Sequence, residues 1–305
     1  PAQGAWTLSI LWYYFSKPAV PLFVMISGAC LLSKVDPPRK AAWRFARVGL
    51  ALLLASYVYF LYDAWVFYGL WPRAARLGAF FGKVWRGEIT DGFWYLYFYL
   101  GLTLALPLWQ RLAAGMGRRA CLYLVAVTLG LGAAWPLAAH YAPALRLPEY
   151  LSLSAPCCYV GLLFAGRYVS EYVKPSKRLG LCSALALAAL LSLCLWLTRL
   201  EYGRVPVGAK YWFMDDRASP ALPVALCAVA MMTLAKCVFS GARARSGRLL
   251  MELGGCAFAV YLAQDLLVAE TRRRLFEPLC GLMPPMAAAL CWELAVFAAA
   301  LAAAW

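Results

Sequence analysis

Two arginines one helical turn apart, Arg44 and Arg47, form the clearest arrangement in this sequence that could hold a ligand. Side chains three residues apart lie on the same face of a helix. Each guanidinium group presents a planar fork of donors that matches the oxygens of a phosphate group. The pair therefore predicts a phosphate-binding site. The same side chains could instead be interfacial cations at the beginning of a membrane helix.

Lys17 precedes Pro18 and an apolar stretch that contains Ser27 and Gly28. Its ammonium group could hold a carboxylate or phosphate of a substrate, or it could be an interfacial lysine without a ligand. No histidine or acid is spaced to activate the Ser27 hydroxyl as a nucleophile. We therefore interpret Ser27 and Gly28 as small residues that let another membrane helix approach closely.

Gln264 and Asp265 interrupt an apolar stretch near the end of the chain, and Tyr261 lies one helical turn before them. Polar and ionisable residues inside a membrane segment are costly and are usually functional. Glutamine can form a hydrogen bond with a sugar hydroxyl, but it cannot be a general base at neutral pH. The sequence predicts a polar contact here, either to a substrate or within the protein.

Asp63, His140 and Glu293 are three further ionisable residues in or beside apolar stretches. An acid at the centre of a bilayer costs about 2.5–3.5 kcal/mol, so we expect both acids to face a partner or a water-filled cavity. Glu293 could relay protons or pair with a cation. His140 is the only histidine. We expect it in an outer loop, far from Arg44 and Arg47, and not as the catalytic base.

Membrane helices must position these residues. The chain is 64% hydrophobic and 14% charged, whereas soluble domains contain about 25% charged residues. Its net charge of +15 comes from cations between apolar runs. There they set topology and contact lipid headgroups, which argues against nucleic-acid binding. The 11 cysteines lie mostly in apolar runs without Cys-x-x-Cys spacing, so no metal site or disulfide framework is predicted.

About nine apolar runs are long enough to cross a bilayer, which takes roughly 17–25 residues of helix. These runs are Leu8–Leu32, Phe45–Phe67, Phe93–Leu112, Ala120–Ala139, Leu151–Val169, Leu179–Thr198, Pro220–Val238, Leu249–Val268 and Pro284–Ala304. The sequence thus predicts an all-α polytopic transmembrane bundle, formed by a single domain of residues 1–305. Leu70–Arg86 is expected to be an interfacial amphipathic helix. Cations in the Lys34–Arg47 loop place this loop in the cytoplasm.

Five segments, taken in order, resemble the acyltransferase-3 family of integral membrane acyltransferases, and the resemblance covers nearly the whole chain. In Gly92–Tyr97 and Phe258–Asp265, this sequence has Gly92 and Gln264 where the family commonly has histidine. The segments and the family patterns to which they are similar are Val20–Gly28 (VPLFFMISG), Arg44–Arg47 (Arg-x-x-Arg), Gly92–Tyr97 with Leu106-Pro107 (HLWFLY…LP), Tyr159–Gly166 (YxGYFLLGY) and Phe258–Asp265 (FGIYLIH).

The resemblance implies an enzyme that moves an acyl group, usually acetyl, from cytoplasmic acyl-CoA to a sugar hydroxyl of a surface glycan or its lipid-linked precursor. It implies a bacterial cytoplasmic membrane protein without a bound cofactor or metal. Its partners would be the bilayer, acyl-CoA and the glycan, and not nucleic acid. The donor would approach Arg44 and Arg47. The substrate-binding candidates are Lys17, Arg44, Arg47, Trp94, Tyr97, Tyr261, Gln264 and Asp265.

The catalytic histidine of the family lies on a first transmembrane helix, which would precede Pro1. About nine spans instead of about ten fit the loss of that helix, so we expect the base upstream of this chain. Gln264 and the missing base leave open a non-catalytic relative that binds acyl-CoA or glycan. Intramembrane acids and broken apolar runs would also suit an exporter, although the two halves of the chain show no corresponding pair of broken segments.

Overall fold

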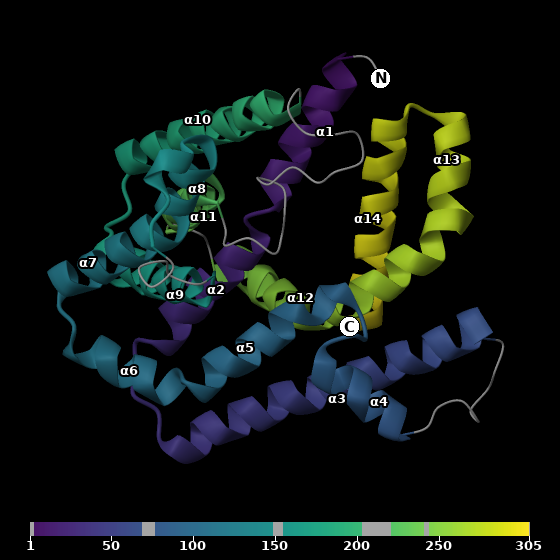
Figure 1. Ribbon diagram of the computed structural model, residues 1–305, viewed down its shortest axis with the longest axis horizontal. Helices are drawn as coiled ribbons and strands as arrows, with labels where there is room; N and C mark the ends of the chain where they lie inside the picture. Colours follow the sequence, from purple (N-terminus) through teal and green to yellow (C-terminus); the bar gives the residue numbers. More distant parts are fainter. Residues whose placement is uncertain (1–2, 69–76, 149–154, 203–220, 241–243, 305) are drawn as a thin grey trace. The chain divides into compact units, whose positions relative to one another are not determined.

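The apolar runs form helices, because a chain in lipid has to pair its backbone donors and acceptors within each segment. The computed structural model describes residues 3–68, 77–148, 155–202, 221–240 and 244–304 (Figure 1). In this part of the chain every regular element is a helix. The longer helices are α1 (Gln3–Ser16), α2 (Ala19–Leu31), α3 (Pro38–Tyr68), α7 (Arg118–Leu129), α9 (Ala155–Tyr172), α10 (Lys177–Tyr202), α11 (Leu222–Phe239), α12 (Ala244–Thr271) and α14 (Pro285–Ala304).

Shorter helical elements complete the described part of the chain. They are α4 (Leu77–Arg86), η1 (Asp91–Phe93), α5 (Trp94–Leu104), α6 (Leu106–Gly115), η2 (Gly130–Ala134), α8 (Trp135–Tyr141), η3 (Pro143–Leu145), η6 (Arg272–Phe276) and α13 (Glu277–Leu282). The elements η2 and η6 are π-helical turns, which join α7 to α8 and α12 to α13. The helix α4 lies within the predicted amphipathic segment, of which residues 70–76 are outside the described part.

Seven helical segments of the described chain are long and apolar enough to cross a membrane. The all-α membrane class predicted from the sequence is confirmed. The seven segments are Gly4–Leu31, Pro38–Val66, Arg118–Tyr141, Lys177–Tyr202, Leu222–Phe239, Met251–Leu282 and Pro285–Ala303. The expected count of about nine is not confirmed.

Two of the predicted spans have no counterpart among the seven segments, and the structure shows a reason for each. The run Phe93–Leu112 is divided at Ala105 into α5 and α6, and α6 has a proline in its first turn. Neither half reaches the roughly 17 residues that a span requires. The run Leu151–Val169 begins outside the described residues. Its described helix α9 carries Arg167 and Glu171, which lower its mean hydropathy.

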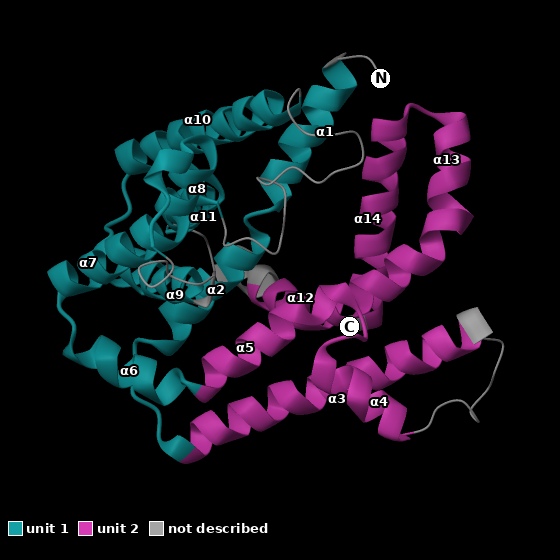
Figure 2. Ribbon diagram, viewed as in Figure 1, with its two compact units in different colours: residues 1–38, 105–241 teal, residues 39–104, 242–305 magenta. Residues whose placement is uncertain are grey.

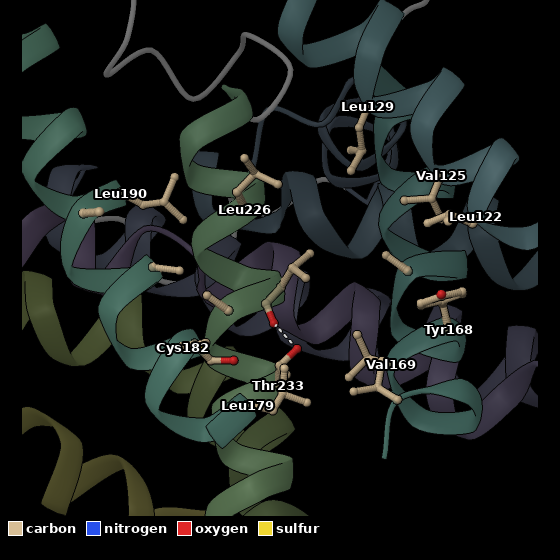
Figure 3. Close-up of a pocket in the computed structure, with 17 residues that line it drawn as sticks. Leu122, Val125, Leu129, Tyr168, Val169, Leu179, Cys182, Leu190, Leu226 and Thr233 are labelled. Atoms are coloured by element: carbon tan, nitrogen blue, oxygen red, sulfur yellow. Dashed lines mark hydrogen bonds between the residues drawn. The ribbon is translucent and has the colours of Figure 1, made fainter. Parts of the chain in front are cut away.

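The chain divides into two compact units (Figure 2). Unit 1 contains residues 1–38 and 105–241, and unit 2 contains residues 39–104 and 242–305. Within unit 1, α9 packs against α2, α7 and α11, while α10 packs against α11. The helices α7, α9, α10 and α11 surround an apolar cavity (Figure 3).

Two glycines allow the closest helix contact of unit 1. A Cβ atom at Gly28 of α2 would overlap the backbone of Leu163 in α9, and one at Gly166 of α9 would overlap the backbone of Met25 in α2. Small residues of this kind let membrane helices approach until their backbones touch. The interpretation of Gly28 as a close-packing residue is therefore confirmed.

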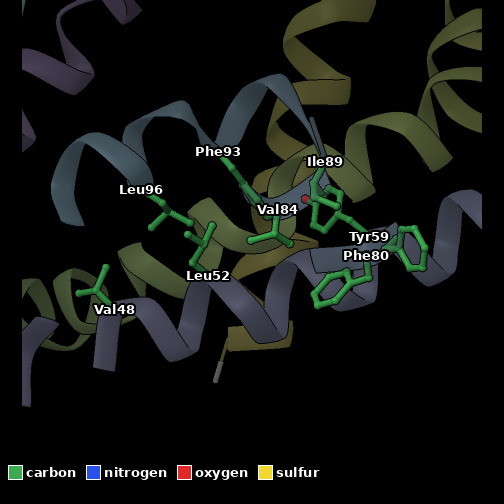
Figure 4. Packing of buried hydrophobic residues seen from close by; sticks show 9 residues of the cluster. Val48, Leu52, Tyr59, Phe80, Val84, Ile89, Phe93 and Leu96 are labelled. Atoms are coloured by element: carbon green, nitrogen blue, oxygen red, sulfur yellow. The ribbon is translucent and has the colours of Figure 1, made fainter. Parts of the chain in front are cut away.

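The core of unit 2 joins α3, α4 and α5 to one face of α12. Its buried side chains are Val48, Leu52, Tyr59, Phe60, Phe80, Val84, Ile89, Phe93 and Leu96 (Figure 4). Leu262 and Leu266 of α12 pack against this cluster. The Tyr59 hydroxyl donates to the Leu262 carbonyl at 2.9 Å and accepts the Leu266 amide at 3.1 Å. These bonds fix the rotation of α12 and hence the direction of its polar residues.

Candidate functional site

Two of the polar residues predicted on α12, Tyr261 and Asp265, contact the segment that leads into α5. The Tyr261 hydroxyl donates to the Gly92 carbonyl, and the Thr90 hydroxyl donates to Asp265 Oδ2 at 3.2 Å. Tyr261 and Asp265 are one helical turn apart, so both face the same neighbouring segment. This contact pairs residues that lie about 170 positions apart in the sequence.

Gly92 leaves the space that the Asp265 side chain occupies. A Cβ atom at position 92 would overlap the Asp265 carboxylate. The sequence resemblance singles out Gly92 because histidine is common in its place. Here the carboxylate of α12 takes up the room that a side chain at position 92 would need, so the two positions depend on each other.

A pocket of about 320 Å³ lies between α12 and α14, which pack against each other. Its polar lining consists of Gln264 and Asp265 from α12 and of Glu293 from α14, with Trp292 beside them. The Trp292 indole donates its Nε1 hydrogen to Thr271 Oγ1 at 2.8 Å, which fixes the position of its ring. The arrangement offers several hydrogen-bond acceptors next to an aromatic face.

Part of this pocket consists of residues predicted from the sequence. Gln264 and Asp265 line it, and so does Glu293, for which a partner or a cavity was expected. Gln264 is half-buried and its amide makes no hydrogen bond within the described part of the chain. Trp292 and Thr90 were not named as candidates. Trp292 could have been found from its place beside Glu293, whereas nothing in the sequence indicates the contact of Thr90.

Trp94 and Tyr97 of α5 do not line the pocket. Trp94 is 40% exposed, and the Tyr97 hydroxyl donates to the Val84 carbonyl of α4 at 2.6 Å. The α5 side chain that contacts the α12 site is Tyr95, whose ring meets that of Tyr261 edge-on at 5.8 Å. The structure places Tyr261, Gln264 and Asp265 on neighbouring turns of α12, with Tyr95 of α5 as an aromatic neighbour of Tyr261.

Arg44 and Arg47 lie one turn apart near the beginning of α3, as the spacing predicts. Arg44 is half-buried and Arg47 is exposed. Tyr59, which contacts α12, lies 15 residues further along the same helix, which corresponds to about 22 Å at 1.5 Å per residue. The arginine pair and the Tyr59 contact with α12 are therefore at two different depths of unit 2.

Lys17 belongs to unit 1, in the turn between α1 and α2. Its ammonium group donates to the Tyr13 hydroxyl at 2.7 Å and lies 5.0 Å from the centre of the Tyr13 ring. These contacts account for its position without a ligand.

His140 lies in the last turn of α8; the expectation of a loop is wrong. The helix continues through this residue, and the proline that follows is Pro143, which begins η3. His140 Nε2 is 3.1 Å from Glu201 Oε1, and the Tyr141 hydroxyl donates to the same oxygen at 3.0 Å. Glu201 of α10 is only 3% exposed. The three residues join the ends of α8 and α10.

An exposed ion pair lies at the end of α4. Arg86 Nε donates to Glu88 Oε1 at 2.8 Å at the end of α4. This hydrogen bond lowers the pKa of the exposed Glu88 carboxyl and raises that of Arg86.

Comparison with known families gives one match. A family model described as an acyltransferase domain, the acyltransferase-3 model, matches residues 2–305. Neither a comparison with curated proteins nor one with solved structures gives a significant match. The match covers all described helices, including those that form the α12–α14 pocket and the arginine pair of α3. The chain therefore belongs to the acyltransferase-3 family of membrane acyltransferases.

Proposed function

We propose that the chain transfers acetyl, or another short acyl group, from cytoplasmic acyl-CoA to a hydroxyl group of a cell-envelope carbohydrate or lipid-linked glycan. Its location would be the bacterial cytoplasmic membrane. The observation that carries the proposal is the α12–α14 pocket, where Gln264, Asp265 and Glu293 lie next to Trp292. Family membership supports acyl transfer in general, and the pocket supports a carbohydrate as the acceptor.

The chemistry of the pocket suits a sugar. Sugar hydroxyls donate hydrogen bonds, and the carboxylates of Asp265 and Glu293 and the amide oxygen of Gln264 accept them. Trp292 supplies a flat apolar surface for the face of the ring. A volume of about 320 Å³ is near the lower end of the roughly 300–1,000 Å³ that is usual for small-molecule sites. The pocket therefore suits one terminal sugar unit and not a folded polymer segment.

The arginine pair of α3 suits the donor. Acyl-CoA carries phosphates, and two guanidinium groups on one helix face can bind them with charge-assisted hydrogen bonds. The distance of about 22 Å along α3 from Arg44 to Tyr59 would be bridged by the extended arm of acyl-CoA, which carries the thioester. In the transfer, the thioester C–S bond breaks as the sugar oxygen bonds to the acyl carbon, and the hydroxyl proton leaves to a base. By resemblance to the family, this base would be a histidine.

Acyl transfer in isolated membranes tests the proposal. Membranes containing the full chain are incubated with acetyl-labelled acetyl-CoA, and label in the carbohydrate fraction is measured. Asp265→Asn keeps the size of the side chain and removes its charge; we expect transfer to fall about 10- to 100-fold, the usual effect of a lost hydrogen bond to a charged group. Equal expression and an unchanged elution profile serve as controls. If wild type transfers label and Asp265→Asn transfers it equally well, the assignment of the pocket is wrong.

A non-catalytic relative is the second candidate function. Gly92 and Gln264 stand where the family commonly has histidine, and the Asp265 carboxylate fills the space at position 92. Such a protein would bind acyl-CoA or glycan without turnover. Saturable binding of acetyl-CoA by the protein, without label transfer to carbohydrate, would favour this function over the enzyme.

A further inference from the structure

Unit 1 contains a second cavity, whose lining is more apolar than that of the α12–α14 pocket. Its volume is about 730 Å³. Side chains of four helices line it, among them Leu122 of α7, Val169 of α9, Leu190 of α10 and Leu226 of α11 (Figure 3). The Thr233 hydroxyl donates to the Val229 carbonyl of its own helix at 2.8 Å, so this polar group is already satisfied. The lining favours a hydrocarbon ligand.

The length of the cavity matches one leaflet of a membrane. Along α10 its lining extends from Leu179 to Leu190, which corresponds to about 16 Å of helix. The hydrocarbon core of a bilayer is roughly 30 Å thick, so the cavity spans about half of it. An acyl chain of one leaflet has this length.

One end of the cavity is surrounded by cations. Three exposed cations lie between the lining residues Val173 and Leu179. Lys174 is in the connection between α9 and α10, and Lys177 and Arg178 begin α10. These three cations therefore lie at the end of the cavity where its apolar lining stops. Three cations within five residues form the kind of basic cluster that attracts acidic phospholipids.

Two further cations lie at the same end and are held there by hydrogen bonds. Arg118 Nε donates to the hydroxyl of the lining residue Tyr168 at 3.2 Å. Lys236 Nζ donates to the carbonyls of Val169 and Ser170 at 2.9 Å and 2.6 Å. The acid Glu171 is close in sequence, but it is paired with Arg167 at 2.8 Å. The balance of charge at this end is positive.

We propose that this cavity binds one acyl chain of a glycerophospholipid with an anionic headgroup, and that Lys174, Lys177 and Arg178 hold the phosphate. The apolar lining selects the chain, and the cations select an acidic lipid over a zwitterionic one. The cations also fix the leaflet, because the end with the basic cluster must lie at the headgroup level. The site is separate in sequence from Arg44 and Arg47 and does not rest on the proposed acyl transfer.

Native mass spectrometry of the full chain tests this site. The protein is released from nanodiscs that contain equal amounts of phosphatidylglycerol and phosphatidylcholine, and the retained lipid is identified. We expect one retained phosphatidylglycerol, with a preference of roughly tenfold or more over phosphatidylcholine. The variant Lys174→Gln/Lys177→Gln/Arg178→Gln should lose the preference. Ala186→Phe, which fills the cavity from the exposed side of α10, should lose the retained lipid altogether.

A control variant separates this site from general charge attraction. Lys34→Gln/Arg39→Gln/Arg111→Gln removes three exposed cations outside this cluster, and it should keep the preference. Equal retention of both lipids by wild type would overturn the proposal, as would loss of the preference in the control. Displacement of phosphatidylglycerol by equimolar palmitoyl-CoA would also overturn it, since the cavity would then be a site for the acyl donor.

Discussion

The α12–α14 pocket of unit 2 and the apolar cavity of unit 1 are both spaces between membrane helices, yet their linings call for different ligands. Gln264, Asp265 and Glu293 give the first pocket hydrogen-bond acceptors. The second is larger and almost wholly apolar, with cations only at one end. The proposed acceptor site is therefore the smaller of the two spaces. Its inward-facing polar side chains support the proposal, because each has a desolvation cost that binding of a polar ligand can offset.

One glycine of each unit leaves room for a neighbouring group, but the two neighbouring groups differ. Gly28 of unit 1 faces the backbone of a neighbouring helix, whereas Gly92 of unit 2 faces the Asp265 carboxylate. A backbone cannot move without displacing its helix, but a side chain can rotate. The first glycine is therefore required for packing, and the second for the geometry of the site.

The largest expected effect comes from Gly28→Val. The new side chain would overlap the Leu163 backbone and force α2 away from α9. Overpacking usually costs about 1–3 kcal/mol, and a backbone clash lies at or above the upper end. We expect loss of the folded monomer peak or a large drop in melting temperature in detergent. Gly101→Ala is the control, because nothing lies within 4 Å of its added methyl group; equal melting of both variants would contradict the close helix contact.

Gly92→Ala should affect transfer more than stability. The added methyl group displaces the Asp265 carboxylate and breaks its bond with Thr90. We expect label transfer to fall roughly tenfold, as for a lost hydrogen bond to a charged group, with a melting temperature close to that of wild type. The transfer assay and a thermal melt measure the two quantities. A variant that transfers normally would show that the position of Asp265 is irrelevant to the pocket.

Glu201→Gln should lower the melting temperature more than it lowers label transfer. This is the opposite of the result expected for Gly92→Ala. It removes the buried charge that His140 and Tyr141 contact in unit 1. Weakening such a buried polar contact costs about 1–3 kcal/mol, which is expected to lower the melting temperature. The lipid selectivity of the apolar cavity should remain, since Glu201 does not line it. An unchanged melt would mean that the His140–Glu201 contact contributes nothing.

The smallest effect is the titration of Glu88. Its hydrogen bond with Arg86 lowers the pKa of the carboxyl below the usual 4.5. Because the carboxyl has a lower pKa in the folded protein, its ionised form stabilises the fold at any pH above the pKa of the unfolded chain. This stabilisation is lost as the pH falls through the pKa of the folded protein. Both side chains are exposed, so no change in melting temperature is expected above pH 5. Carboxyl NMR should show the low pKa, and Arg86→Gln should restore the usual value.

The sequence predicted the long spans well, because their apolar runs are continuous. It failed where local residues interrupt a run. The segment Phe93–Leu112 divides at Ala105, ahead of a proline in the first turn of α6. Arg167 is buried at 7% exposure because it bonds to the Ala113 carbonyl and to Glu171. A pattern of hydropathy cannot reveal the Ala113 carbonyl as a partner, since it belongs to another helix, α6.

The candidate site was only partly predictable for a similar reason. Tyr261, Gln264 and Asp265 are visible as polar residues in an apolar helix. Their partners Thr90 and Gly92 lie on a segment far away in sequence, and only the packing of α12 against the unit 2 core brings them together. His140 is expected in an outer loop, but the helix ends only after Tyr141. Local sequence places a residue on an element, and tertiary packing decides what it contacts.

The most direct test of the proposed function measures how transfer saturates with each substrate. Asp265→Asn is predicted to raise the KM for the carbohydrate acceptor about tenfold and to leave the KM for acyl-CoA unchanged. Arg44→Ala is predicted to do the opposite, because it removes a donor to the phosphates of acyl-CoA. This crossed pattern would support an acceptor pocket at α12–α14 and a donor site on α3. If both variants raise the KM for the same substrate, or if neither variant raises a KM, the assignment of two separate sites is wrong.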